Sequence, residues 1–305
     1  MPGLGTLFPV VRGAILLAIL LLIGVAVATR LARAHVEPGS GRAAQIGGWH
    51  ARLPGLGAWF LLMLSLARGA LQLLTFVEPG EPLESGLIQA VLLEGTWGTS
   101  WTLQTVAALV LLAGSWLVRW RPGATWYLLV TTTAVVAWAQ TGMGHPTEEI
   151  WPPFTGRVVD LLHLGGAGIW LGTLAILSLT TFPVLRRAAR IDELAGVVCA
   201  FSIPARTGAA LLVASGVIAT WQYVGSLGAL FSTTYGLLVV GKVGLFVLIA
   251  AAGWWNWRIL TPALAAATPD APVRLRRAIT IELAMAAVVL GLTAVLTGSS
   301  FPGTP

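Results

Sequence analysis

Charged residues are scarce in this chain. Only 10% of its 305 residues are Asp, Glu, Lys or Arg, whereas 56% are hydrophobic and the mean hydropathy is +0.84. A soluble domain needs a larger charged surface, so the composition places the chain among integral membrane proteins. The single cysteine, Cys199, excludes a disulfide within this chain and a cysteine-rich metal cage.

The chain also has almost no lysine and no long basic run. Lys242 is the only lysine, and the remaining basic residues are arginines scattered in short groups. We therefore expect no nucleic-acid partner, because such binding needs a continuous basic stripe. A nucleophile elbow, a phosphate loop and paired carboxylates in a cleft are missing too, so we do not expect an enzyme.

Long apolar runs are what the sequence has instead. About 20 apolar residues suffice to span a bilayer as a helix. The runs predict an all-α, polytopic membrane helix bundle with about eight transmembrane helices in contact with the lipid bilayer. They lie at about 10–31, 52–76, 101–120, 124–142, 158–183, 205–224, 234–258 and 277–297. The stretch from Ser85 to Glu94 is expected to form a short helix on the outer face.

Charge alternates between successive loops. Arginines gather after the first run, between the third and fourth, in the 185–203 loop and before the last run, whereas the loops at 77–100 and 141–155 are acidic. Basic loops face the cytoplasm in membrane proteins. The pattern therefore predicts that both termini lie on the outer side, with Arg12 as the one residue that does not fit.

Polar residues concentrate where the fourth run ends and the fifth begins. Asp160 and His163 are three residues apart and share one helix face with Trp170. His145 ends the preceding helix on the same side. A short connection makes the two helices antiparallel neighbours, so the two imidazoles could converge.

These residue types suit a metal ion. Neutral imidazole binds copper, zinc, iron or nickel, and the nearby thioether of Met143 favours Cu(I). Asp160 could accept the second ring N–H of His163, as metal-bound histidines commonly require. The alternative is structural: His145 would then lie at the membrane interface, and His163 would bond to a neighbouring helix. Both interpretations stay open from spacing alone.

Other ionisable groups interrupt the apolar runs. A charge within a membrane needs a partner, a water path or a function. Lys242 or Arg68 is expected to form an ion pair with Asp160. Glu282 is expected to clamp helices near the inner interface, with a proton or cation exit step as the alternative. Its expected neighbours are Arg277, Asn256 and Arg258. Two further histidines, His35 and His50, are interpreted as solvated loop residues.

Several of these residues form an ordered set of motifs. The set begins with Gly144-His145 and continues with D-x-x-H-x-x-x-A-x-x-W-x-G from Asp160 to Gly172. Later come Thr233, Tyr235 and Gly236 followed by Lys242, then Asn256 with Arg258, then Arg277 with Glu282. Over about residues 144–302 the chain thereby resembles the copper-resistance D family, CopD or PcoD.

The resemblance implies an eight-helix protein of the bacterial inner membrane that is linked to copper movement. It implies copper ligands at His145 and His163 on the outer side, and a possible periplasmic partner of the CopC type. Residues 143–305 would form the half that resembles this family, and residues 1–142 an N-terminal four-helix half of the same continuous bundle. Self-association or a larger membrane complex is left open.

Two other functions are compatible with the residues. A b-type haem protein would use two histidines from different helices as axial ligands. A structural or assembly subunit would use the polar groups only as helix clamps. An optical spectrum and a metal analysis would distinguish these possibilities from copper binding.

Overall fold

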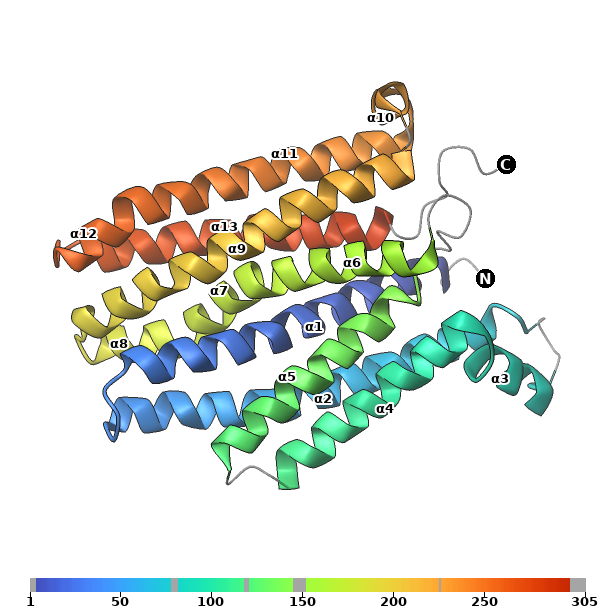
Figure 1. The fold of residues 1–305 in the computed structure, drawn as a ribbon, viewed down its shortest axis with the longest axis horizontal. Coiled ribbons are helices and arrows are strands. Elements are labelled where there is room, and N and C mark those ends of the chain that lie inside the picture. Colours follow the sequence, from blue (N-terminus) through green and yellow to red (C-terminus); the bar gives the residue numbers. More distant parts are fainter. Residues whose placement is uncertain (1–3, 78–81, 118–120, 145–151, 225, 297–305) are drawn as a thin grey trace.

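Helices account for all the regular structure that is described here. The structure, a computed structural model, describes residues 4–77, 82–117, 121–144, 152–224 and 226–296, and no strand occurs in these ranges. Figure 1 shows the long helices packed side by side as one bundle. The expected all-α polytopic bundle is confirmed, and the chain is a multi-pass membrane protein by the length and hydropathy of its helices.

The first half of the chain has four long helices and one short one. The described elements are α1 (Leu4–His35), α2 (Gly41–Leu74), α3 (Ser85–Leu92), α4 (Gly95–Leu117) and α5 (Pro122–Thr141). The short helix α3 has the place expected for the stretch from Ser85 to Glu94, and none of its residues is buried. It lies at one end of the bundle, beside the start of α4 (Figure 1).

The second half contains π-helical turns within its long helices. The first composite helix comprises α6 (Pro153–Ala167), η1 (Gly168–Gly172), α7 (Thr173–Ile176), η2 (Leu177–Thr181) and α8 (Phe182–Arg187). After it come α9 (Ile191–Val224), α10 (Leu227–Ser232), α11 (Thr234–Trp255), η3 (Asn256–Leu260), α12 (Thr261–Ala265) and α13 (Ala271–Leu296). Such π-turns are rare and occur often at functional sites.

Seven helical segments in the described ranges are long and apolar enough to cross a membrane. The eighth expected helix, α5, is not among them, because Thr131, Thr132, Thr133 and Gln140 lower its hydropathy. It nevertheless lies within the bundle, packed against α1 and α4. The start of α1 and the end of α13 lie at the same end of the bundle (Figure 1), as an even number of crossings requires. We call this the predicted outer end.

Several helices extend beyond their apolar runs. The second run predicts a start near residue 52, but α2 begins after Ser40, whose side chain accepts a hydrogen bond from the Ala43 N–H. Likewise α9 starts at Ile191, with Asp192 and Glu193 in its first turn, where acidic groups favour a helix N-terminus. The expected loop at 185–203 is therefore mostly helical, and only residues 188–190 separate α8 from α9.

Helix α1 lies in the middle of the bundle. It contacts α2 and α5 on one side and η1, α7, α9 and α13 on the other. Its crossing with η1 is a backbone contact, because a Cβ on Gly172 would overlap the carbonyl oxygen of Leu20 and one on Gly24 would overlap Gly172. Small residues allow membrane helices to approach this closely. The division at residue 142 stays a prediction, since α1 packs against elements of both halves.

An ion-pair network joins the two halves at the opposite, predicted inner end. Glu193 accepts from Arg42 at 3.0 Å and from Arg190 at 3.1 Å, and Glu37 also pairs with both arginines. Arg190 further donates to Asp192 at 2.8 Å. That hydrogen bond raises the pKa of the Arg190 guanidinium above its usual value, so it stays charged. The network ties the start of α2 to the start of α9.

Candidate functional site

The candidate site is built on the first turns of α6. Pro153 is the first helical residue, a position where its missing N–H costs nothing. Asp160 and His163 follow on one face of this helix and are partly buried. At about 1.5 Å per residue, His163 lies roughly 15 Å along the helix axis from Pro153. Both side chains therefore lie in the half of the bundle near the predicted outer end.

Two glycines bring α6 against α9 and so give His163 its partner. A Cβ on Gly166 would lie 2.7 Å from the carbonyl oxygen of Gly208, so the two backbones are in direct contact. Two turns along α9, the Oγ of Ser215 lies 3.0 Å from Nδ1 of His163. The imidazole ring also passes beside Gly216, where a Cβ would be 3.6 Å from its Cε1. The ring is thus held through Nδ1, which leaves Nε2 available for a ligand.

Basic and hydroxyl groups from two other helices act on Asp160 electrostatically. Arg12 of α1 and Lys242 of α11 both interact electrostatically with its carboxyl group. Lys242 also acts on His163, and Tyr235, two turns before Lys242 on α11, interacts with Asp160. The structure therefore brings together Asp160, His163, Lys242 and Tyr235, which the sequence motifs named.

The expected ion pair to Asp160 does not form through Arg68 or Lys242. Arg68 of α2 is 6% exposed and donates instead to the Gln140 side-chain oxygen at 3.1 Å and to the Met143 carbonyl oxygen at 2.9 Å. Lys242 makes no direct ion pair within the described ranges, so its charge acts at longer range. The rotation of α2 about its axis prevents an ion pair between Arg68 and Asp160, because it directs Arg68 to the end of α5 rather than to α6.

Met143 lies just after α5 and is 3% exposed. Its position is set by Arg68 and by the backbone hydrogen bond from its N–H to the Gln140 carbonyl oxygen at 3.3 Å. His145, the second predicted ligand, lies outside the described residues. Among those that are described, no three His, Cys, Asp or Glu side chains gather closely enough to hold a metal ion. A complete ligand set would therefore need Met143 or His145 besides the residues of α6.

Trp170 lies near a second polar region, deeper in the bundle, that contains Glu282 and Asn256 of the expected inner clamp. Trp170 is 4% exposed and packs edge-on against Phe246, with ring centroids 6.0 Å apart. It lies seven residues beyond His163, about 10 Å along the helix. Asn256 donates a hydrogen bond to Glu282, as the clamp interpretation expects. Arg258 is exposed and its guanidinium lies over Trp257, so it takes no part in that pair.

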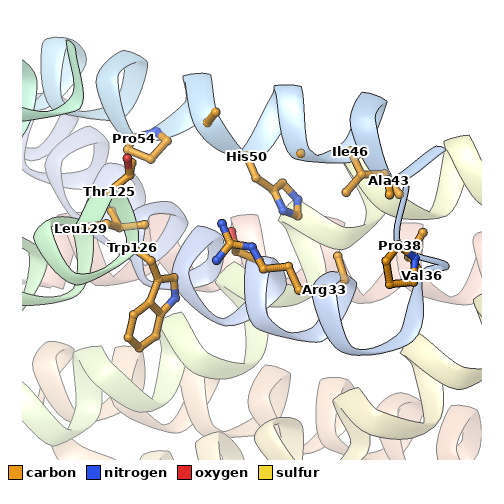
Figure 2. A pocket seen from close by; sticks show the side chains of 14 residues that line it. Arg33, Val36, Pro38, Ala43, Ile46, His50, Pro54, Thr125, Trp126 and Leu129 are labelled. Carbon is orange, nitrogen blue, oxygen red and sulfur yellow. The ribbon is translucent and has the colours of Figure 1, made fainter. Parts of the chain in front are cut away.

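His50 is buried, contrary to its interpretation as a solvated loop residue. It is 6% exposed, and its Nε2 lies 3.1 Å from the Thr180 hydroxyl of η2, because α2 starts earlier than its apolar run predicts. Figure 2 shows His50 and Arg33 directed into one cavity of about 360 Å³, near Trp126. His35 is exposed, as expected, and its Nδ1 lies 3.1 Å from the Leu31 carbonyl oxygen.

Three residues of the candidate site were not predicted from the sequence. The charge pattern of the loops does not account for Arg12, which lies within α1 and acts on Asp160. Ser215 and Gln140 are polar groups inside apolar helices, where they hold His163 and Arg68. One feature of the sequence could have identified all three: each is a polar residue inside an apolar run, and polar groups within a membrane span need a partner.

Comparisons with known proteins find the same family that the chain resembles, and the family match covers the later motifs. Residues 195–296 match the family described as Copper resistance protein D. The chain is 29% identical over 210 residues to a copper resistance protein D of Pseudomonas syringae pv. tomato, a match that covers 65% of this chain and 66% of that protein. It is 30% identical over 181 residues to the copper transport protein CutJ of Bacillus subtilis (strain 168), covering 57% of this chain and 32% of that protein. No solved structure matches the chain.

Proposed function

We propose that this chain, which belongs to the copper resistance protein D family, binds copper ions at the predicted outer end of its bundle for transport or homeostasis across a bacterial inner membrane. The names of its two relatives support copper as the cargo. A multi-pass bundle with ionisable groups inside its spans supports a path for an ion. A periplasmic CopC-type protein is the proposed donor or acceptor at that face.

One observation carries the ligand assignment: His163 is fixed through Nδ1 by Ser215, beside Asp160. A hydrogen bond to one ring nitrogen orients a metal-binding histidine and sets which nitrogen is left for the metal. Nε2 of His163 is therefore the proposed copper ligand. The thioether of Met143 and the imidazole of His145 are proposed to complete the site, and a soft thioether favours Cu(I).

Lys242, Tyr235 and Arg12 are proposed to position the Asp160 carboxyl group rather than to bind copper. Ammonium and guanidinium groups are not metal ligands, but both act on Asp160. An ionised Asp160 would offset the repulsion between these cations and an incoming copper ion. Helices α1, α6 and α11 would thus share one charge-balanced site.

A copper titration of the purified full chain tests the assignment. We expect His163→Ala and His145→Ala each to weaken copper binding at least tenfold, since each removes a proposed ligand. His35→Ala is the matched control, because His35 is exposed and lies at the opposite end of α1. Unchanged stoichiometry and affinity in the His163→Ala and His145→Ala double variant would refute the site.

The same preparation separates the two alternatives. A Soret band with bis-histidine character would indicate haem in place of copper. A structural or assembly role would be indicated if the histidine variants changed neither metal content nor copper tolerance while deletion of the chain depleted a partner complex.

A further inference from the structure

A second polar niche lies between α11 and α13, away from the proposed copper ligands. It contains the Glu282 side chain of α13, which is 2% exposed, and the Asn256 side chain at the start of η3, which is 8% exposed. The Asn256 amide nitrogen donates a hydrogen bond to one Glu282 carboxyl oxygen. The amide is the neighbour that interacts with this buried acid.

No cation in the described part of the chain forms an ion pair with the Glu282 carboxyl group. None of the charged side chains in the described ranges acts electrostatically on it. The elements packed against α13 are α1, α7, α11, η3 and α12, and α7 and α12 carry no ionisable residue. The ionisable groups on the other three elements and on α13 itself are Arg12, Arg30, Arg33, His35, Tyr235, Lys242, Arg258, Arg274, Arg276 and Arg277.

These groups face elsewhere. Arg12, Tyr235 and Lys242 act at Asp160 near the predicted outer end. Arg30 lies over Trp126, Arg33 lines the cavity near His50, and Arg258 lies over Trp257. The three arginines of α13 and His35 are exposed. An ionised carboxylate at this depth would therefore be buried without a countercharge, which is strongly disfavoured.

The hydrogen bonds of Asn256 point to the protonation state of Glu282. Asn256 Oδ1 is buried and has no hydrogen-bond partner in the described part of the chain. A carboxylate can only accept, and would leave that oxygen unpaired, whereas a protonated carboxyl has one O–H to donate. A neutral acid and a primary amide can exchange two hydrogen bonds: Nδ2–H to one carboxyl oxygen and the carboxyl O–H to Oδ1. Protonation thus satisfies both buried groups.

An aromatic ring packs beside the acid. A Cβ on Gly253 would lie 3.4 Å from the Trp170 ring and 3.8 Å from the second Glu282 carboxyl oxygen, so the glycine lets the indole lie close to the acid. Both the indole and the amide belong to π-helical turns, Trp170 to η1 and Asn256 to η3. Two irregular turns at one buried acid are typical of a functional site rather than of plain packing.

We propose that Glu282 and Asn256 form a proton-binding site, in which Glu282 carries a proton in this conformation and exchanges it with the predicted inner side. The balance is simple: the proton leaves the carboxyl oxygen for water at that side, and the vacated carboxylate accepts a proton again from water. The site itself is independent of the copper ligands. Its coupling to copper movement, as a proton moved for each ion, rests on the proposed function.

Infrared spectroscopy of the purified full chain tests the site without any copper readout. A protonated, buried carboxyl group gives a C=O stretching band that an ionised carboxylate lacks. We expect this band at pH 7 in the wild type and its loss in Glu282→Gln, which keeps the shape and the hydrogen bond to Asn256. Glu193→Gln is the matched control: Glu193 is also buried, at 6% exposed, but it pairs with Arg42 and Arg190 and is expected to be ionised.

A second variant covers the case in which Glu282→Gln does not fold. Asn256→Ala keeps the acid but removes both of its hydrogen bonds, so the band should move to higher frequency. Identical carboxyl bands in the wild type and in whichever of the two variants folds would overturn the proposal. If the protein binds no copper but the band responds as expected, the proposed function fails and the proton site stands.

Discussion

The guanidinium of Arg68 holds the backbone of Met143, with Nη2 2.9 Å from the Met143 carbonyl oxygen. The same side chain binds Gln140, so one residue of α2 fixes the last turn of α5 and Met143, the second residue after it. This arginine reaches out of its own helix to the segment that leads to His145. It therefore links the N-terminal helices to the proposed copper site, although it is not itself a ligand.

Replacing Arg68 should loosen that segment. We expect Arg68→Met to destabilise the chain by about 1–2 kcal/mol, because two hydrogen bonds to a buried charged group are lost. Copper affinity should fall as well, since Met143 loses its anchor. Thermal unfolding in detergent and a copper titration measure the two effects. Arg52→Met on the same helix is the control, because Arg52 is exposed, and it should change neither quantity.

Removing the partner of His163 should weaken metal binding without removing a ligand. We expect Ser215→Ala to lower copper affinity about 10–100-fold, the usual effect of losing a hydrogen bond that orients a metal-bound histidine. Ser202→Ala serves as control, since Ser202 lies on the same helix and its hydroxyl bonds only to the Val198 carbonyl oxygen, at 3.4 Å. Equal affinities for the two variants would mean that Ser215 does not orient the ring.

The crossing between α1 and η1 leaves no room for a side chain. We expect Gly172→Ala to destabilise the bundle by about 1–3 kcal/mol or more, because the new methyl group would meet the Leu20 carbonyl. Gly165→Ala, one helical segment earlier, has no atom within 4 Å of the new Cβ and should be tolerated. The yield of monodisperse protein and its thermal unfolding measure the difference. Similar behaviour of both variants would show that the helices separate at little cost.

Glu193 should contribute more to the stability of the bundle than Asp192, its exposed neighbour in the sequence. It is 6% exposed and accepts from Arg42 and Arg190, so Glu193→Ala leaves both arginines without their central acceptor. We expect a loss of about 1.5–3 kcal/mol, as for hydrogen bonds between charged groups. Asp192→Ala is the comparison, because the Asp192 side chain is 67% exposed and solvent-exposed ion pairs contribute little to stability. Thermal unfolding at low and high salt should show the Glu193 effect shrinking as salt screens the network.

Local motifs predicted which residues of α6 and α11 matter, but not how they pair. Asp160 and His163 share a face because they are three residues apart, and Lys242 and Tyr235 share one because they are seven apart. The partner of His163 could not be predicted from spacing, since Ser215 is 52 residues away and meets the ring only through the contact of Gly166 with Gly208. The spacing predicts an ion pair of either Lys242 or Arg68 with Asp160, but Arg68 binds Gln140 instead, because a helix's rotation about its axis is set by all of its neighbours at once.

Helix ends were predicted less well than helix centres. The apolar run of α2 starts near residue 52, and the helix starts at Gly41, with the consequence that His50 is buried in a helix rather than solvated in a loop. Hydropathy reports where a helix lies in lipid, whereas its ends depend on caps and on contacts such as Ser40 with Ala43 and Arg42 with Glu193. The cap is local, but the contact of Arg42 with Glu193 forms only in the assembled bundle.

The sequence by itself determined that this chain is a multi-pass helical membrane protein that resembles the copper resistance protein D family and has a few ionisable groups inside its spans. Run length and composition suffice for this, because lipid offers backbone groups no hydrogen bonds and so admits few structures. Only the tertiary structure decided which helices touch, and therefore that Ser215 holds His163 and Arg68 holds Met143. The physical reason is distance: these partners are brought together by close helix crossings, which depend on the shape of every surface in the bundle rather than on any one stretch of residues.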